Sequence, residues 1–282
     1  MISLEENKYG KSRVRLVRVK RRAEEHDFRE WNVEILVRGD FASCFAAGDN
    51  SEILPTDTMK NTVYALARNS AADCMEEFAA ELVDFLLSRN PQISAAEVSV
   101  EEKAWEHLDI SGRPHPTAFM QTSGERQTAT VSRGQDSEAT VISGLENLVI
   151  MKTADSGFEG FKKDSLTTLP ETADRLFGTA MRARWTYIAT ASDFAALRKN
   201  IRSTLLQEFA NHQSKSVQHT LYAMAQAVLE ATPQVQDIEL RMPNKHCLLI
   251  DLSRFGLDNP NEIFVPVDEP HGYIEARICR KG

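Results

Sequence analysis

Cysteine is scarce in this chain, and its placement excludes whole classes of protein. The 282 residues contain four cysteines, Cys44, Cys74, Cys247 and Cys279, which lie far apart and form no CxxC pair. A dense disulfide framework is therefore excluded, and reduced thiols in a cytoplasm are favoured. The seven histidines form no cluster with these cysteines at the spacing of metal ligands, so we expect no metal site.

The chain also lacks a long apolar run and a targeting signal. No segment approaches the ~18 to 20 apolar residues of a membrane span, and the N-terminus has no signal-peptide pattern. The C-terminus, Arg280-Lys281-Gly282, is not a Ser-Lys-Leu peroxisomal address. We therefore expect no membrane contact and a cytoplasmic location.

An excess of positive charge is missing as well. The net charge of −8 argues against a nucleic-acid partner. The basic segment from Arg13 to Lys20 alternates charged and apolar residues, a pattern commoner on an edge strand or a barrel exterior. The 42% hydrophobic content supports a substantial core instead.

The order of predicted elements repeats. Strands are expected at 14–19 and 31–37, two helices follow, and strands return at 98–110, 128–132 and 139–142. The second half has strands at 148–151 and 185–189, helices at 194–212 and 216–230, then strands at 238–252, 263–267 and 274–279. Each half therefore has the order β-β-α-α-β-β, which predicts an α+β fold with antiparallel sheet and helices on one face. We expect two units, 1–143 and 144–282.

A polar segment, Leu54 to Thr62, leads directly into a helical apolar pattern. Asp57 or Thr58 is expected to cap the helix by accepting from its first free amides. The cluster of hydroxyl, carboxylate and amine groups at a helix start also suits a ligand site, where backbone amides favour anions.

Other polar side chains stand out by position. Asn244 and His246 have the same strand parity as Met242, which predicts that they point to an otherwise apolar face. There they would form either a buried pair with its hydrogen bonds satisfied or part of a site. Pro243 beside them indicates a bulge or a strand end. Gln218 lies in the first turn of a helix, where an amide is usually solvated.

Arg175 and Phe158 both have an ordinary structural interpretation. Arg175 follows a short helix predicted from Pro170 and would form a surface ion pair with Asp174 or Glu171. Phe158 would be a core aromatic, although its flanking glycines also allow a flat ligand to approach the backbone.

Together these segments resemble the urate oxidase (uricase) family, in order and spacing, from about Tyr9 to about Gly272. The segments are Tyr9-Gly10-Lys11, Thr56-Asp57 with Lys60-Asn61-Thr62, Phe158-Glu159-Gly160-Phe161, Thr167-Thr168-Leu169 through Asp174-Arg175, Val217-Gln218, and Pro243-Asn244-Lys245-His246. The resemblance implies two tunnelling-fold (T-fold) units per chain, a homotetramer with active sites at subunit interfaces, and no cofactor. It implies the oxidation of urate by dioxygen and water to 5-hydroxyisourate and hydrogen peroxide.

The resemblance also implies a role for each motif residue. Arg175 and Gln218 would hold the urate edge, Phe158 would stack on its ring, and the amides of Val217 and Asp57 would add contacts. Asn244 and Thr56 would hold dioxygen, and Lys11, Thr56 and His246 would form a proton relay.

Three features depart from the fungal and animal family pattern. Glu159 stands where tryptophan is often found, Cys247 follows His246 in place of an aromatic residue, and the missing peroxisomal tail favours a bacterial cytoplasm. Two alternatives to this function are another T-fold purine or pterin enzyme, such as a cyclohydrolase or a pterin synthase, and a purine-binding protein without turnover. The first typically uses zinc or an activated cysteine. The second would not need Lys11, Thr56, Asn244 and His246.

Overall fold

Alternating apolar residues form the first strands of the chain. The computed structural model describes residues 2–281, and for Ser123 it describes the backbone alone. Val33, Ile35 and Val37 are fully buried, and the residues between them are more exposed. This period of two directs one face of a strand into a core. By its internal contacts the chain divides into two units, 2–145 with 186–195 and 146–185 with 196–281.

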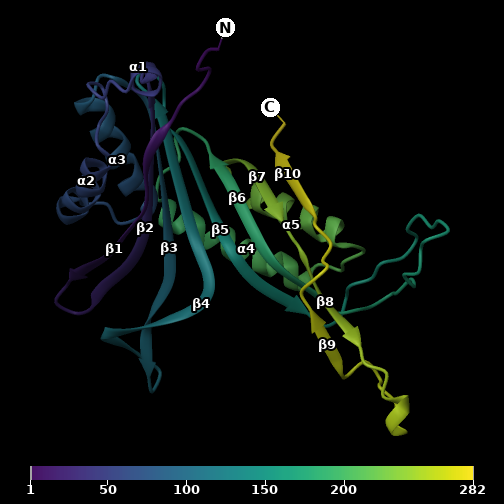
Figure 1. The fold of residues 1–282 in the computed structure, drawn as a ribbon. Helices are drawn as coiled ribbons and strands as arrows, with labels where there is room; N and C mark the ends of the chain where they lie inside the picture. Colours follow the sequence, from purple (N-terminus) through teal and green to yellow (C-terminus); the bar gives the residue numbers. More distant parts are fainter. Residues whose placement is uncertain (1, 282) are drawn as a thin grey trace. The chain divides into compact units, whose positions relative to one another are not determined.

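The first unit is an antiparallel sheet covered by helices. Its strands are β1 (Tyr9–Arg21), β2 (His26–Gly39), β3 (Ile93–Ile110) and β4 (Arg113–Gly134), in that order, followed by the start of β5 (Thr140–Lys152). The helices α1 (Ala42–Ala47), α2 (Thr56–Asn69) and α3 (Met75–Arg89) lie between β2 and β3 in sequence. Figure 1 shows α2 and α3 against one face of this sheet.

Large side chains close the core between that sheet and its helices. Trp31 of β2 stacks on Phe78 of α3 with ring centroids 4.9 Å apart. Met59 and Val63 of α2 and Leu82 of α3 are also fully buried. Burial of an apolar face at helical spacing fixes which side of each helix meets the sheet.

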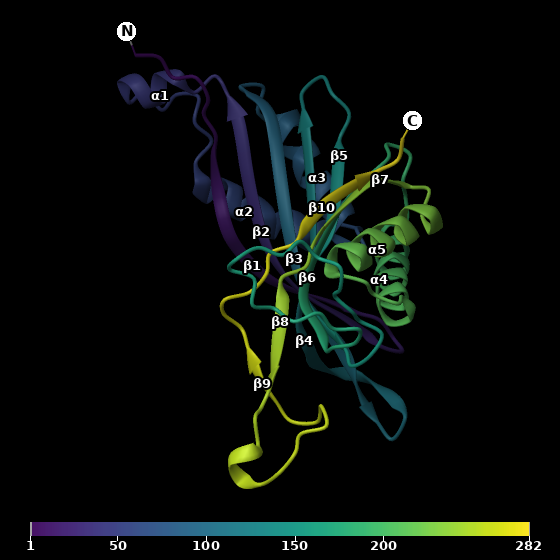
Figure 2. The same ribbon diagram turned by 90° about the vertical axis from the view of Figure 1, so that its right-hand side faces the viewer.

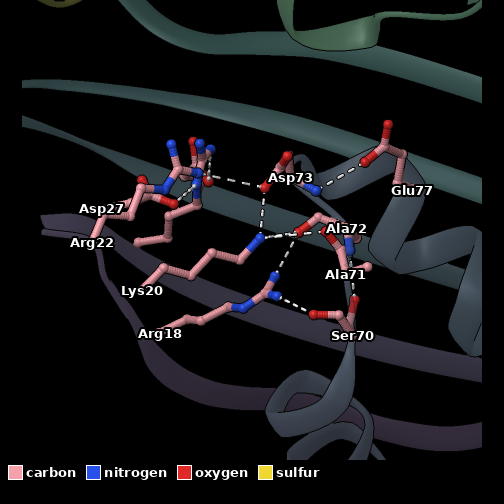
Figure 3. Close-up of polar contacts among 11 residues, drawn as sticks. Arg18, Lys20, Arg22, Asp27, Ser70, Ala71, Ala72, Asp73 and Glu77 are labelled. Carbon is pink, nitrogen blue, oxygen red and sulfur yellow. Dashed lines mark hydrogen bonds and ion pairs between the residues drawn. The ribbon is translucent and has the colours of Figure 1, made fainter.

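The basic residues of β1 bind the segment that joins α2 to α3 (Figure 3). The Arg18 guanidinium donates to the carbonyls of Ser70 and Ala72, and Lys20 Nζ donates to Ala72 O at 3.0 Å and to Asp73. Ser70 is the C-cap of α2, and a cation there stabilises the partial negative charge of the helix C-terminus. This arrangement gives the basic segment a structural role.

The second unit repeats the plan with additional short elements. It contains the end of β5, nearly all of β6 (Phe177–Tyr187) and of α4 (Phe194–Asn211), and then α5 (Val217–Ala231), β7 (Val235–Arg241), β8 (Asn244–Leu249), the 3-10 turn η1 (Ser253–Phe255), β9 (Phe264–Val267) and β10 (Glu275–Cys279). The sheet order is β6-β7-β10, while β8 pairs with β6 and β9. In Figure 2, α4 and α5 lie together on one side of β6 and β7.

The α+β class, the antiparallel sheet and the paired helices confirm the predicted fold class. Several details differ. The strands expected at 139–142 and 148–151 are one continuous strand, β5, and 128–132 is the end of the 22-residue β4. β6 begins at Phe177, well before the expected 185, because small residues such as Gly178 and Ala180 obscure the alternation. The short helix α1 was not expected.

No helix within residues 2–281 is long and apolar enough to cross a membrane.

Candidate active site

The first unit ties strand β1 to the start of helix α2. The Tyr9 hydroxyl accepts from Leu54 N at 2.8 Å and donates to Leu54 O at 3.2 Å. Burial raises the pKa of this phenol, so it keeps its proton for the second bond. Thr56 follows two residues later and is half-buried. The bonds from Tyr9 to Leu54 therefore hold the backbone that leads into Thr56.

Gly10 and Lys11 lie where β1 departs from regular pairing. A Cβ on Gly10 would lie 1.8 Å from Ile35 O, so only glycine allows this approach to β2. The register between β1 and β2 shifts after Lys11, and Arg13 within the bulge has a φ of 58°. A β-bulge changes the direction of neighbouring side chains and is common beside functional sites.

Helix α2 does not use the cap that its sequence suggested. The helix begins at Thr56, and its cap position is Pro55, which makes no side-chain hydrogen bond to the free amides. Asp57 instead accepts from Lys60 Nζ at 2.5 Å and from Asn61 Nδ2 at 3.0 Å. The expected cap by Asp57 or Thr58 is therefore wrong, because Asp57 is already inside the first turn, and no side-chain cap competes for the first amides.

Two lysines act on the Asp57 carboxylate. The Lys60 hydrogen bond lowers the pKa of the Asp57 carboxyl, and the charge of Lys11 adds to the effect. Lys11 on β1 and Asp57 on α2 are thus near enough for their charges to interact, and α2 contacts β1 directly. Lys11, Thr56 and Asp57 therefore form a group on the first unit.

In the second unit, Phe158 is held in a short backbone bridge. Its N donates to Thr172 O at 2.7 Å, and Thr172 N donates back to Phe158 O at 3.2 Å. Its ring stacks on Phe161 with centroids 4.8 Å apart and planes 13° apart. Both residues are only partly buried.

Arg175 lies over Phe158, with its Cζ 5.1 Å from the ring centroid. Within residues 2–281 it makes no ion pair, because Glu171 binds Lys163 at 2.9 Å and Asp174 accepts from Ser156 N at 3.1 Å. The expected surface ion pair is therefore wrong, and so is the short helix expected at Pro170, a stretch without helix. Arg175 is half-buried, and this burial lowers the pKa of its guanidinium. The guanidinium N–H groups can bind an anion.

The N-terminus of α5 brings Val217 and Gln218 close to that segment. Ser216 caps the helix by accepting from His219 N at 3.1 Å, as a serine at this position commonly does. The preceding Ser214 N donates to Asp155 O, and Ser214 O accepts from Gly157 N, each at 2.9 Å. The Phe158 segment and the α5 start are thus joined through main-chain bonds.

Asn244 and His246 open strand β8. The strand break at Pro243 is confirmed, since β7 ends at Arg241 and β8 begins at Asn244. No hydrogen bond joins the two side chains in the described part of the chain, and Asn244 Oδ1 is buried without a partner, so the satisfied pair is not observed. Leu248, expected on the apolar face, is 55% exposed because β8 leaves the sheet core and pairs with β9.

One cavity of about 500 Å³ gathers most of these residues. Among its lining residues are Arg175, Val217, Asn244, His246 and Cys247. Gln218 does not line it, and Phe158 lines an adjacent cavity of about 530 Å³ that shares Asp174 with the first. Four of the predicted residues of this unit therefore share one cavity, and Phe158 is linked to it through its contact with Arg175.

Some lining residues carry no signal in the sequence. Thr153, Leu176 and Asn261 meet in the cavity from separate segments, and no local pattern sets them apart. Glu159, where the family often has tryptophan, is exposed. Within residues 2–281 no group of three or more His, Cys, Asp or Glu side chains is arranged to hold a metal ion.

Comparison with known proteins relates the whole chain to one family. The family model described as Uricase matches residues 7–132 and 141–275. Uricases from Arthrobacter globiformis and Dictyostelium discoideum are 39% and 38% identical to the chain, over 100% and 99% of its length and 91% and 98% of theirs.

Solved structures give the same result. The crystal structure of Arthrobacter globiformis uricase matches 100% of this chain and 96% of its own with a TM-score of 0.94 at 39% identity. A urate oxidase from Bacillus sp. TB-90 shares the fold, with a TM-score of 0.85 at 23% identity over 97% of this chain and 100% of its own. The fold is thus the α+β T-fold of these structures, and the chain belongs to the uricase family.

Proposed function

We propose that this uricase-family enzyme converts urate, dioxygen and water to 5-hydroxyisourate and hydrogen peroxide without a cofactor. Two electrons leave urate and reduce dioxygen to peroxide, and the oxygen atom of water adds to the purine ring. The observation that carries the proposal is the cavity that Arg175, which makes no ion pair within residues 2–281, lines together with Asn244 and His246.

Substrate binding uses complementary shapes and charges. A planar purine anion presents adjacent oxygen and nitrogen atoms, which the Arg175 guanidinium binds with two parallel hydrogen bonds. Gln218 binds the same edge, the Val217 amide at the α5 N-terminus adds a donor, and Phe158 stacks on the ring. Arg175 Cζ lies 5.1 Å from the Phe158 ring centroid, so the two groups are close enough to contact the same ligand.

Oxidation requires a base. Triplet dioxygen reacts poorly with closed-shell molecules, so urate must first lose a proton and become electron-rich. Lys11 takes this proton through the Thr56 hydroxyl, and His246 completes the relay. Asn244 and Thr56 hold dioxygen, then water, and the Asp57 amide adds a substrate contact. Donors fixed in advance stabilise the anion that forms.

The site is completed by assembly. Lys11, Thr56 and Asp57 lie on the first unit, and Phe158, Arg175, Val217, Gln218, Asn244 and His246 lie on the second. In this proposal the chain forms a homotetramer, residues 1–143 and 144–282 each form one T-fold unit, and the first group reaches into the cavity of a neighbouring subunit. Dissociated subunits would keep helix α2 and lose turnover.

One experiment tests the reaction. Purified protein treated with a chelator and then dialysed is mixed with urate in air, and the ultraviolet absorbance of urate and the peroxide concentration are followed. Loss of urate with one peroxide formed per urate consumed is expected without additives. Intact urate, or turnover only after metal is added, contradicts the proposal. Urate binding without turnover would indicate the alternative, a purine-binding protein.

A further inference from the structure

Two buried polar atoms face each other across β6 and β8 without a partner. Thr179 of β6 is directly opposite Asn244 of β8 in the antiparallel register. The Thr179 hydroxyl and the Asn244 carboxamide oxygen are both buried, and neither makes a hydrogen bond within residues 2–281. Buried polar atoms nearly always have a partner, so this pair of exceptions requires an explanation.

The surroundings of Thr179 restrict what that partner is. Thr179 is 0% exposed and lies on the buried face of β6 between Phe177 and Met181, whose side chains carry no hydrogen-bond donor. The hydroxyl is therefore closed off from bulk solvent and from any second subunit. The cavity begins beside it, because Phe177 and Gly178 on one side and Asn244 on the other line that space.

Cross-strand geometry suits a single bridging molecule. Directly opposite side chains of an antiparallel pair have Cβ atoms about 4.5–5.5 Å apart. Two oxygen atoms joined through one water are separated by a similar length, since each O–H···O bond spans about 2.7–2.8 Å. Ordered waters in proteins typically satisfy such otherwise unpaired buried groups.

We propose that Thr179 is a positioning residue for Asn244, acting through one bound water that joins its hydroxyl to the Asn244 carboxamide oxygen. This inference rests on the proposed role of Asn244 in holding dioxygen. The water fixes which end of the carboxamide is the acceptor, so that the amide nitrogen stays free as a donor.

The other side of Asn244 is limited by Gly272. Asn244 N donates to Gly272 O at 3.0 Å, and a Cβ on Gly272 would lie 3.1 Å from Asn244 Nδ2. The missing side chain leaves space at the amide nitrogen for a small molecule such as dioxygen or water. Thr179 and Gly272 thus define the orientation of Asn244 from opposite ends of its amide.

The test compares Thr179→Val, Thr179→Ser and Asn244→Ala. Valine keeps the shape and removes the hydroxyl, and serine keeps the hydroxyl. Thr130→Val is the matched control, because Thr130 is a strand threonine of the first unit whose hydroxyl has its own partner in Ser99, at 2.9 Å. Urate affinity is measured without oxygen, and kcat and the KM for dioxygen are measured with it.

We expect Thr179→Val to lower kcat over KM for dioxygen about five- to tenfold, with urate affinity within about twofold of the parent protein. Thr179→Ser restores the parent values, Thr130→Val leaves them unchanged, and Thr179→Val has no further effect in an Asn244→Ala background. Equal losses in the valine and serine variants, or loss of urate affinity with kcat, overturn the proposal.

Two results separate this inference from the proposed function. If Asn244→Ala leaves the dioxygen parameters unchanged, the role of Asn244 itself is wrong. If Asn244→Ala lowers them and Thr179→Val does not, only the positioning role fails. Should the valine variant not fold, a high-resolution structure of the parent protein decides, since a Thr179 hydroxyl that contacts neither water nor Asn244 overturns the proposal.

Discussion

The Tyr9 hydroxyl holds both backbone groups of Leu54, accepting from its N at 2.8 Å and donating to its O at 3.2 Å. This contact joins the strand that carries Lys11 to the segment that leads into Thr56. The distance between these two residues of the proposed relay therefore depends on a side chain that takes no part in the chemistry.

Tyr9→Phe is expected to lower the free energy of unfolding by about 1–2 kcal/mol, since two hydrogen bonds at a partly buried position are lost. It should also reduce kcat, because Thr56 is no longer held at a fixed distance from Lys11. Denaturant unfolding and steady-state kinetics measure the two effects. Tyr64→Phe, an exposed change on α2, is the control and should alter neither. A Tyr9→Phe enzyme with the parent kcat would show that this tether does not position Thr56.

Lys11→Met and Arg175→Ala should fail in different ways. Removing a general base costs about 10²- to 10⁴-fold in rate, so Lys11→Met should lower kcat by that range with urate affinity nearly unchanged. Arg175→Ala should weaken urate binding at least about tenfold and lower kcat over KM as well, because charge-assisted bonds to the anion are lost. Binding is measured without oxygen and turnover with it.

Lys8→Met, an exposed change on the same segment, serves as the control for a lost positive charge near the N-terminus. Equal loss of urate binding in the Lys11 and Arg175 variants would remove Lys11 from the relay and assign it to the substrate contacts.

Local patterns predicted the strands, the paired helices and the fold class, because burial imposes a period of two on strands and of 3.6 on helices. They did not predict where β6 begins, because the small residues Gly178 and Ala180 hide the alternation of apolar and polar residues at its start. They also misplaced the α2 cap, where a first-turn Asp57 binds Lys60 instead of the free amides.

The candidate site was predicted only as separate motifs. Proximity of Arg175 to Phe158, or of Thr179 to Asn244, depends on pairings between distant segments that no local pattern encodes. The same applies to ion-pair partners. Glu171 and Asp174 are close to Arg175 in sequence, but in the structure Glu171 binds Lys163 and Asp174 accepts from Ser156 N.

Acid should destabilise the start of α5 through His212. Burial and the nearby His219 lower the His212 pKa below its ordinary 6.5, with Lys152 acting in the same direction and Glu208 opposing them. Below pH 6.5 the unfolded chain therefore binds more protons than the folded chain, so the free energy of unfolding falls as the pH falls towards the folded-state pKa.

His212→Asn removes this titration and should flatten the fall in unfolding free energy between pH 7.5 and pH 5.5. Denaturant unfolding at several pH values measures it. The parent protein, unfolded at the same pH values, is the reference. A His212→Asn protein with an unchanged slope would show that the acid sensitivity arises elsewhere.

Mixing two inactive variants tests whether each site is shared between subunits. Lys11→Met damages the group on the first unit, and Arg175→Ala damages the group on the second. Suppose that a site combines the first-unit residues of one chain with the second-unit residues of its neighbour. An Arg175→Ala chain then supplies intact first-unit residues, a Lys11→Met chain supplies intact second-unit residues, and the two form one intact site. Equal amounts assembled at random in a symmetric oligomer should regain about a quarter of the parent activity.

The two variants are unfolded together, refolded and assayed, with each variant refolded alone as the control. Recovery should depend on joint refolding, because exchange between assembled oligomers is slow when subunits share large interfaces. Sites formed within single chains would give no recovery at all, since every chain in the mixture carries one damaged group. Recovery near a quarter would therefore place Lys11 and Arg175 of one active site on different subunits.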